Sequence, residues 1–151
     1  ATPGRREGKK DLEDAMEKHY AFTEPPYSLH DMPVRFSASG DMLVLTTEYG
    51  MQSPEPPYMT SSGRVVFRAV KWSESYAYIL SPRGNFGTFC GEKLPLSELL
   101  ERCPELRLDV MDEHFGLDRA RFCGYADVGG ECRELAVEIC CTGQIAYIAD
   151  E

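Results

Sequence analysis

The first half of the chain is a series of short runs in which apolar side chains recur at every second position. In one run Val34, Phe36 and Ala38 alternate with polar residues, and the small and polar residues 39–41 separate it from an apolar run over 42–49. A period of two belongs to a strand with one buried face, whereas a helix repeats every 3.6 residues. Residues 34–49 therefore predict a β-hairpin.

Further strands are expected wherever the same alternation returns. The pattern predicts strands over the following ranges: 64–72, 75–80, 85–90, 106–110, 135–141 and 144–149. The last two flank Thr142 and Gly143 and are expected to form a closing hairpin. Nine residues of the strand-like runs are expected in or beside the core: Leu43, Leu45, Val66, Phe67, Tyr78, Leu80, Leu108, Val137 and Ile148.

Helical periodicity marks fewer segments. Apolar residues at positions i, i+3, i+4 and i+7 predict helices over 9–20 and 95–103, the second ending before Pro104. A weaker helix is expected over 112–123, where Gly116 would cost roughly 1 kcal/mol against alanine. Because hairpins outnumber helices, the expected class is α+β: a mainly antiparallel sheet with two or three helices packed on it.

The length of 151 residues fits one domain, so we expect a flexible tail over 1–11 and a single α+β domain over 12–151. The chain begins at Ala1 rather than methionine, which is expected of a processed protein or a fragment of a longer one. The longest apolar runs are about as short as 42–45, far below the roughly 20 residues of a membrane-spanning helix.

Charge argues against a nucleic-acid partner, because the net charge is −9 and phosphate binding needs a basic surface. The charge is uneven: residues 1–72 have a net charge of −1 and residues 73–151 a net charge of −8. An acidic second half could face a basic partner, or it could be an ordinary solvated surface.

All six cysteines lie in the second half of the chain: Cys90, Cys103, Cys123, Cys132, Cys140 and Cys141. They fit buried thiols, one to three disulfides or, less well, a metal site, since no C-x-x-C pair occurs. Because these alternatives imply different redox environments, the sequence does not decide between a secreted and an intracellular protein. Cys140 and Cys141 would point to opposite faces of a strand, so one of them is expected to bond outside the core.

No catalytic, cofactor-binding or metal-binding residue can be assigned from motifs. The only phosphate-loop-like pattern is G-x-x-G at Gly84 and Gly87, which favours a turn. His114 and Cys123 would face opposite sides of one helix, which argues against a local nucleophile–base pair. Acidic pairs such as Asp112 with Glu113 are typical of solvated faces.

The least ordinary segment is a proline-rich stretch over 50–63, predicted to be a loop of 14 residues. Aromatic, thioether and proline side chains gather in and beside it, and they are the candidate partner-binding residues: Tyr49, Met51, Pro54, Pro56, Pro57, Tyr58 and Met59. Such side chains are enriched at protein interfaces. The chain is therefore expected to be a non-enzymatic module that binds a protein partner through exposed loops. The alternative is a small hydrolase or transferase that uses a cysteine or histidine of the C-terminal half.

Overall fold

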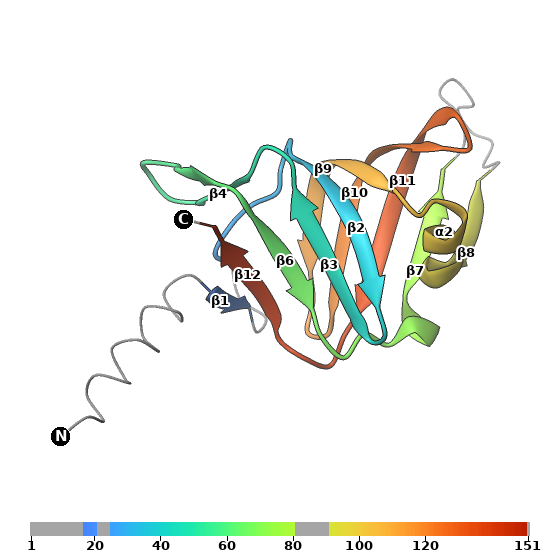
Figure 1. Ribbon diagram of the computed structural model, residues 1–151, viewed down its shortest axis with the longest axis horizontal. Coiled ribbons are helices and arrows are strands. Elements are labelled where there is room, and N and C mark those ends of the chain that lie inside the picture. The colour runs from blue at the N-terminus through green and yellow to red at the C-terminus, as the bar shows by residue number, and fades with distance from the viewer. Residues whose placement is uncertain (1–16, 21–24, 81–90, 151) are drawn as a thin grey trace.

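The computed structural model describes residues 17–20, 25–80 and 91–150, the first range by its backbone only. Strands dominate these residues (Figure 1). In chain order they are β1 (Glu17–Tyr20), β2 (Pro33–Ser39), β3 (Met42–Thr47), β4 (Met51–Gln52), β5 (Thr60–Ser61), β6 (Gly63–Phe67), β7 (Tyr76–Ile79), β8 (Glu92–Pro95), β9 (Arg107–Phe115), β10 (Arg119–Val128), β11 (Glu131–Cys140) and β12 (Ile145–Ala149). The 3₁₀ turn η1 (Trp72–Glu74) and the helix α2 (Leu96–Arg102) complete the list of elements.

Ten of these strands form one sheet in the order β1-β12-β6-β3-β2-β9-β10-β11-β7-β8, and every neighbouring pair is antiparallel. The predicted hairpin is confirmed: β2 and β3 pair with Phe36 opposite Leu45. Gly129 and Gly130, both at positive φ, make the tight two-residue turn between β10 and β11. Glycine is favoured there because such turns need φ > 0 at both central residues.

The sheet curls, so strands far apart in its order face each other. Phe67 on β6 meets Phe122 on β10 edge to face, with ring centroids 6.1 Å apart. At one end, the chain after β6 reaches the chain after β11: Val70 forms a bridge with Cys141, and the Lys71 amide donates to the Cys140 carbonyl over 2.8 Å. We call the strands from β1 to β2 in the sheet order one wing and those from β9 to β8 the other. The curl encloses one apolar core between these two wings.

Most of the core was predicted. Leu43, Leu45, Val66, Phe67, Leu108 and Val137 are buried, and the other three expected residues, Tyr78, Leu80 and Ile148, are partly buried. The helix expected over 95–103 is also confirmed as α2. Its side chains Leu96 and Leu99 are fully buried, and Leu100 packs partly against the core. In Figure 1, α2 lies beside β7 and β8 at one end of the molecule.

The expected α+β class is wrong, because the described residues contain a single α-helix and are mostly antiparallel strand. The weaker helix over 112–123 is instead the end of β9, a turn and the start of β10. A period of two is present in β10, where Ala120, Phe122, Gly124 and Ala126 are buried at alternate positions. Glycine is a residue type typical of turns, so Gly124 interrupts this alternation in the sequence.

Two other expectations are wrong, one about a helix and one about strand pairing. Residues 17–20, the end of the helix expected over 9–20, form β1 on the edge of β12. The strands of the expected closing hairpin exist, but β11 pairs with β10 and β7, whereas β12 pairs with β1 and β6. The chain between them crosses from one wing to the other, where the Thr142 amide donates to the Ala69 carbonyl.

Several expectations lie outside the described residues: the tail over 1–11, the helix up to residue 16, the Gly84–Gly87 turn and the strand over 85–90. A single domain over 12–151 stays a prediction. Neither described helical element is long and apolar enough to cross a membrane.

Candidate functional site

The segment predicted as a loop over 50–63 folds into a small hairpin and the start of β6. Met51 pairs with Ser61 and Gln52 with Thr60, so β4 and β5 form their own two-stranded sheet. The turn between them is closed by its own hydrogen bonds, in which the Ser53 amide donates to the Met59 carbonyl and the Tyr58 amide to the Glu55 carbonyl. We name residues 49–61 the contact hairpin. It projects from the sheet at the end of the molecule opposite α2 (Figure 1).

The predicted partner-binding residues divide into two groups. Tyr49, Tyr58 and Met59 are 71%, 54% and 66% exposed, and the prolines of the tip, Pro54, Pro56 and Pro57, are exposed as well. Met51 is fully buried and belongs to the core. The hairpin therefore carries exposed apolar groups both near its turn and, at Tyr49, before β4, with Met51 buried at its base.

The base of the contact hairpin is tied to the sheet. Ser28 and Gln52 exchange both backbone hydrogen bonds, at 2.7 and 2.9 Å. The buried hydroxyl of Thr47 donates to the Gly63 carbonyl over 2.9 Å and accepts from the Gly63 amide over 3.1 Å. Gly63 cannot carry a side chain, because a Cβ there would meet the Ile148 carbonyl and the Met51 methyl group. These contacts fix where the hairpin leaves the sheet.

A mostly buried carboxylate, Glu113 on β9, holds the chain next to this base. Its Oε2 accepts from the Ser28 hydroxyl and its Oε1 from the Leu29 amide, both over 2.8 Å. Burial raises the pKa of Glu113, while those two hydrogen bonds and the charge of His30 act in the opposite direction. Glu113 was predicted as part of a solvated acidic pair, and only its neighbour Asp112 is exposed.

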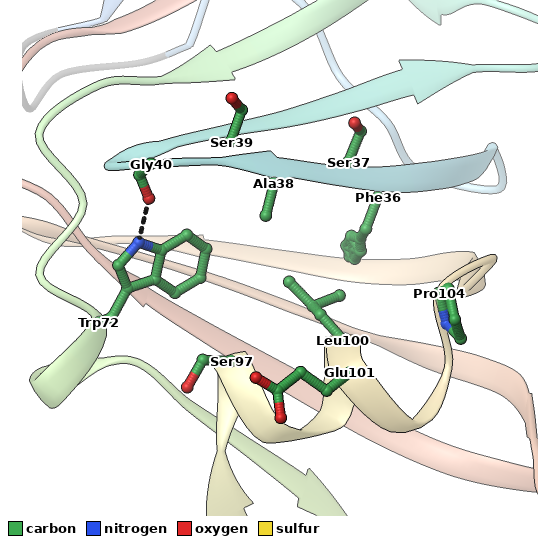
Figure 2. A pocket seen from close by; sticks show the side chains of 10 residues that line it. All are labelled: Phe36, Ser37, Ala38, Ser39, Gly40, Trp72, Ser97, Leu100, Glu101 and Pro104. Carbon is green, nitrogen blue, oxygen red and sulfur yellow. Dashed lines mark hydrogen bonds between the residues drawn. The ribbon is translucent and has the colours of Figure 1, made fainter.

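A separate groove of about 450 Å³ lies between the β2–β3 turn and α2 (Figure 2). Its apolar lining comes from Phe36, Ala38, Trp72, Leu100 and Pro104. The indole of Trp72 is held in place because its Nε1 donates to the Gly40 carbonyl over 2.7 Å. We call this hollow the α2 groove; its size is within the range of sites that bind small molecules or side chains.

Two further hollows share lining residues with the α2 groove or with each other. Pro104 also lines a second hollow of about 500 Å³, and Asp127 lines both that one and a third of about 220 Å³. The polar residues along the three include the carboxylates of Glu101, Glu105 and Asp127. Among the described residues, no basic side chain forms an ion pair with any of these three carboxylates.

The cysteines of the described part of the chain are all unbridged thiols. Cys141 belongs to the core, whereas Cys140 is buried on the other face, with its Sγ 3.8 Å from Glu74 Oε2 and 3.9 Å from Asp118 Oδ2. This agrees with the expected opposite orientation of the two. Burial raises the pKa of both thiols, that of Cys141 to about 11. Cys90 lies outside the described residues.

No nucleophile–base pair is assembled in the part of the chain that the structure describes. His114 is exposed opposite Arg121, and Cys123 lies opposite Asp112, so the two are diagonal neighbours on one face rather than on opposite sides of a helix. No hydrogen bond joins them, and the described residues contain no cluster of three or more histidine, cysteine or acidic side chains that could hold a metal ion.

Sequence patterns missed the α2 groove altogether. Trp72 was predicted to end a strand, and Phe36 and Leu100 fitted apolar stripes facing the core. The one signal available was that Trp72 is the single tryptophan of the chain. No protein-family model, curated protein or solved structure matches the chain, and its function is therefore inferred from this geometry alone.

Proposed function

We propose that this protein is a non-enzymatic interaction module that binds a protein partner through the contact hairpin. The observation that carries the proposal is the exposure of Tyr49, Tyr58 and Met59 together on one short hairpin. Tyrosine is among the residues that most often dominate binding energy, and methionine adapts its shape to a partner.

The position of these side chains supports binding better than it supports stability. Exposed at half or more of their surface, they contribute little to the core, whereas Met51 at the base is wholly buried. Large apolar groups gathered on an exposed segment are characteristic of an interaction surface.

The hairpin is also prepared for binding. Its strands pair, its turn is hydrogen-bonded and its base is tied to Ser28, Thr47 and Gly63. A segment whose backbone is held before binding loses less conformational entropy when the partner arrives.

The alternative function, a small hydrolase or transferase using a cysteine or histidine, lacks a comparable observation. Cys140 and Cys141 are buried thiols with raised pKa values, which lowers the fraction of reactive thiolate. The exposed His114 has no cysteine or serine partner among the described hydrogen bonds.

The test begins with a photo-crosslinking residue placed at Tyr58, used to capture a partner from an extract of the source organism. The captured protein is then purified and titrated against the wild type and the double variant Tyr58→Ser with Met59→Ser. We expect the double variant to bind at least about 10-fold more weakly, because anchors of this kind are worth more than 1 kcal/mol each.

The matched control is Leu117→Ser, which removes a 77% exposed apolar side chain from the β9–β10 turn. It should leave partner affinity unchanged, and both the control and the double variant should keep the melting temperature of the wild type. The proposal fails if the double variant loses several kcal/mol of stability, or if the control weakens binding equally.

A further inference from the structure

The α2 groove combines an aromatic side chain, Trp72, with a carboxylate, Glu101, that forms no ion pair within the described part of the chain. The Trp72 indole and the Glu101 side chain of α2 both line the groove (Figure 2). The indole Nε1 is already bonded to Gly40, so the ring is held in one orientation. An indole and a carboxylate that line one hollow attract an organic cation, above all the planar guanidinium of arginine.

The groove is apolar enough to receive the stem of such a side chain. Phe36, Leu100 and Pro104 line it, and an arginine buries its three methylene groups against surfaces of this kind while its head stays polar. The hydroxyl of Ser97 lies at the same hollow, at an exposed position in the first turn of α2.

The two hollows beyond the groove are also lined by acidic side chains. The second and third hollows bring Glu105 and Asp127, again without a basic partner among the described residues. Among the described residues, the one basic side chain that lines the three hollows is Arg107, and it is occupied by Glu48 and Asp109 at 2.9 and 3.0 Å. The second hollow shares Pro104 with the α2 groove and Asp127 with the third, so neighbouring residues of one extended chain could occupy them.

We propose that the α2 groove and the two hollows beyond it form a docking surface for a basic, extended peptide segment of a partner protein. An arginine of that segment would lie on the Trp72 indole beside Glu101, and further basic residues would face Glu105 and Asp127. A second copy of this chain is a poor occupant, because its own net charge is −9. The α2 groove lies at the end of the molecule opposite the contact hairpin (Figure 1), whereas the third hollow reaches Arg107, which bonds Glu48 next to Tyr49. The inference is argued from Trp72 and the carboxylates of the hollows and not from the exposed side chains of the hairpin, so it does not depend on the proposed function.

Because Trp72 is the only tryptophan, its fluorescence reports on the groove directly. The probe is a blocked octapeptide of alternating arginine and alanine, titrated into the full chain at low and at physiological salt. We expect a saturable change in emission, with an affinity that falls as salt rises. The corresponding octapeptide of glutamate and alanine should produce no change.

Two double variants separate a specific surface from overall charge. Glu101→Gln with Glu105→Gln removes two charges from the hollows and should weaken binding by about 10-fold or more. Asp112→Asn with Glu134→Gln removes two exposed charges that line none of the hollows, and should change the affinity by less than about 2-fold. Equal losses in the two variants would overturn the proposal in favour of nonspecific attraction.

Three further measurements complete the test. Ser97→Lys, a change at an exposed position, places a competing cation in the groove and should abolish the fluorescence response. If N-acetyl-arginine amide binds as tightly as the octapeptide, the site takes a single small cation and the peptide assignment is wrong. If removal of residues 1–10, which include Arg5 and Lys9, strengthens binding by about 10-fold, the occupant is the chain's own N-terminal segment and a partner is excluded.

Discussion

Glu113 holds the chain by hydrogen bonds, and its contribution to the free energy of unfolding depends on pH because its carboxyl group is mostly buried. Its two oxygens hold the Ser28 hydroxyl and the Leu29 amide next to the base of the contact hairpin. Because burial favours the neutral form, the pKa of Glu113 in the folded protein lies above its ordinary value of 4.5. The folded state then binds this proton more tightly than the unfolded chain does.

We expect the contribution of Glu113 to the free energy of unfolding to fall as pH rises from about 4.5 through the raised pKa, and to stay level above it. Glu113→Gln removes this titration. The free energy of unfolding of the wild type, relative to that of Glu113→Gln, should therefore decrease as pH rises across that window. Urea unfolding at successive pH values measures this difference. Asp112→Asn, on the exposed face of β9, is the control. A difference that is constant with pH would contradict the assignment.

The cysteines differ from one another in how deeply they are buried. Cys132 is exposed, whereas Cys140 and Cys141 are buried, and a pKa of about 11 leaves about a thousandth of Cys141 as thiolate at pH 8. We expect a thiol reagent to label Cys132 rapidly in the native protein and to label the other two only after unfolding. Mass spectrometry of labelled peptides measures this, and fast native labelling of Cys140 or Cys141 would show that this end of the sheet is open.

Among the elements, the β9–β10 pair depends on one glycine. The register shifts between Cys123 and Gly124, and a Cβ at Gly124 would collide with the Asp109 carbonyl oxygen on β9. A bulge lets two strands bend together, which the curl of this sheet requires. Position 124 is therefore restricted to glycine by close approach of the backbone.

Gly124→Ala is expected to cost about 2 kcal/mol or more, because either the strand or its partner must shift. Gly116→Ala is the matched control: the nearest atom to a Cβ there is the Arg119 carbonyl oxygen at 3.9 Å, so the change should stay within about 0.5 kcal/mol. Equilibrium denaturation of both variants checks the difference. Similar stabilities for the two would show that β9 and β10 can separate at the bulge without cost.

At the level of the whole molecule, the curl is maintained where the inner faces of the two wings meet. Phe122 on β10 contacts Phe67 on β6 at 6.1 Å and Phe115 on β9 at 5.9 Å, both edge to face. The Phe67 contact joins strands that are not neighbours in the sheet, so it forms only when the sheet has closed over the core.

A double-mutant cycle measures this closure. With Phe67→Leu, Phe122→Leu and the combination of both, we expect a coupling energy of about 0.5–1.5 kcal/mol. The comparison cycle pairs Phe67→Leu with Leu99→Ala on α2, at the other side of the molecule, and should be additive within about 0.5 kcal/mol. A coupling near zero for the two phenylalanines would mean that the wings do not meet in solution.

Local patterns predicted a substantial part of this structure. The β2–β3 hairpin, α2 and most of the core follow from periods of two and 3.6, which depend only on residues close in sequence. The partner-binding residues stay a prediction; of the seven, Met51 alone is buried, which could not be foreseen because one buried methionine among exposed neighbours has no local signature.

Pairing over long distances could not be predicted in the same way. β11 and β12 are close in sequence and yet lie in different parts of the sheet, and residues 17–20 became a strand because β12 offered an unpaired edge. The α2 groove is assembled from residues 36–40, Trp72 and residues 97–104, which no local period relates. Short-range preferences determine which segments become strands or helices, whereas the choice of neighbours depends on how the whole sheet buries its apolar face and satisfies its backbone hydrogen bonds.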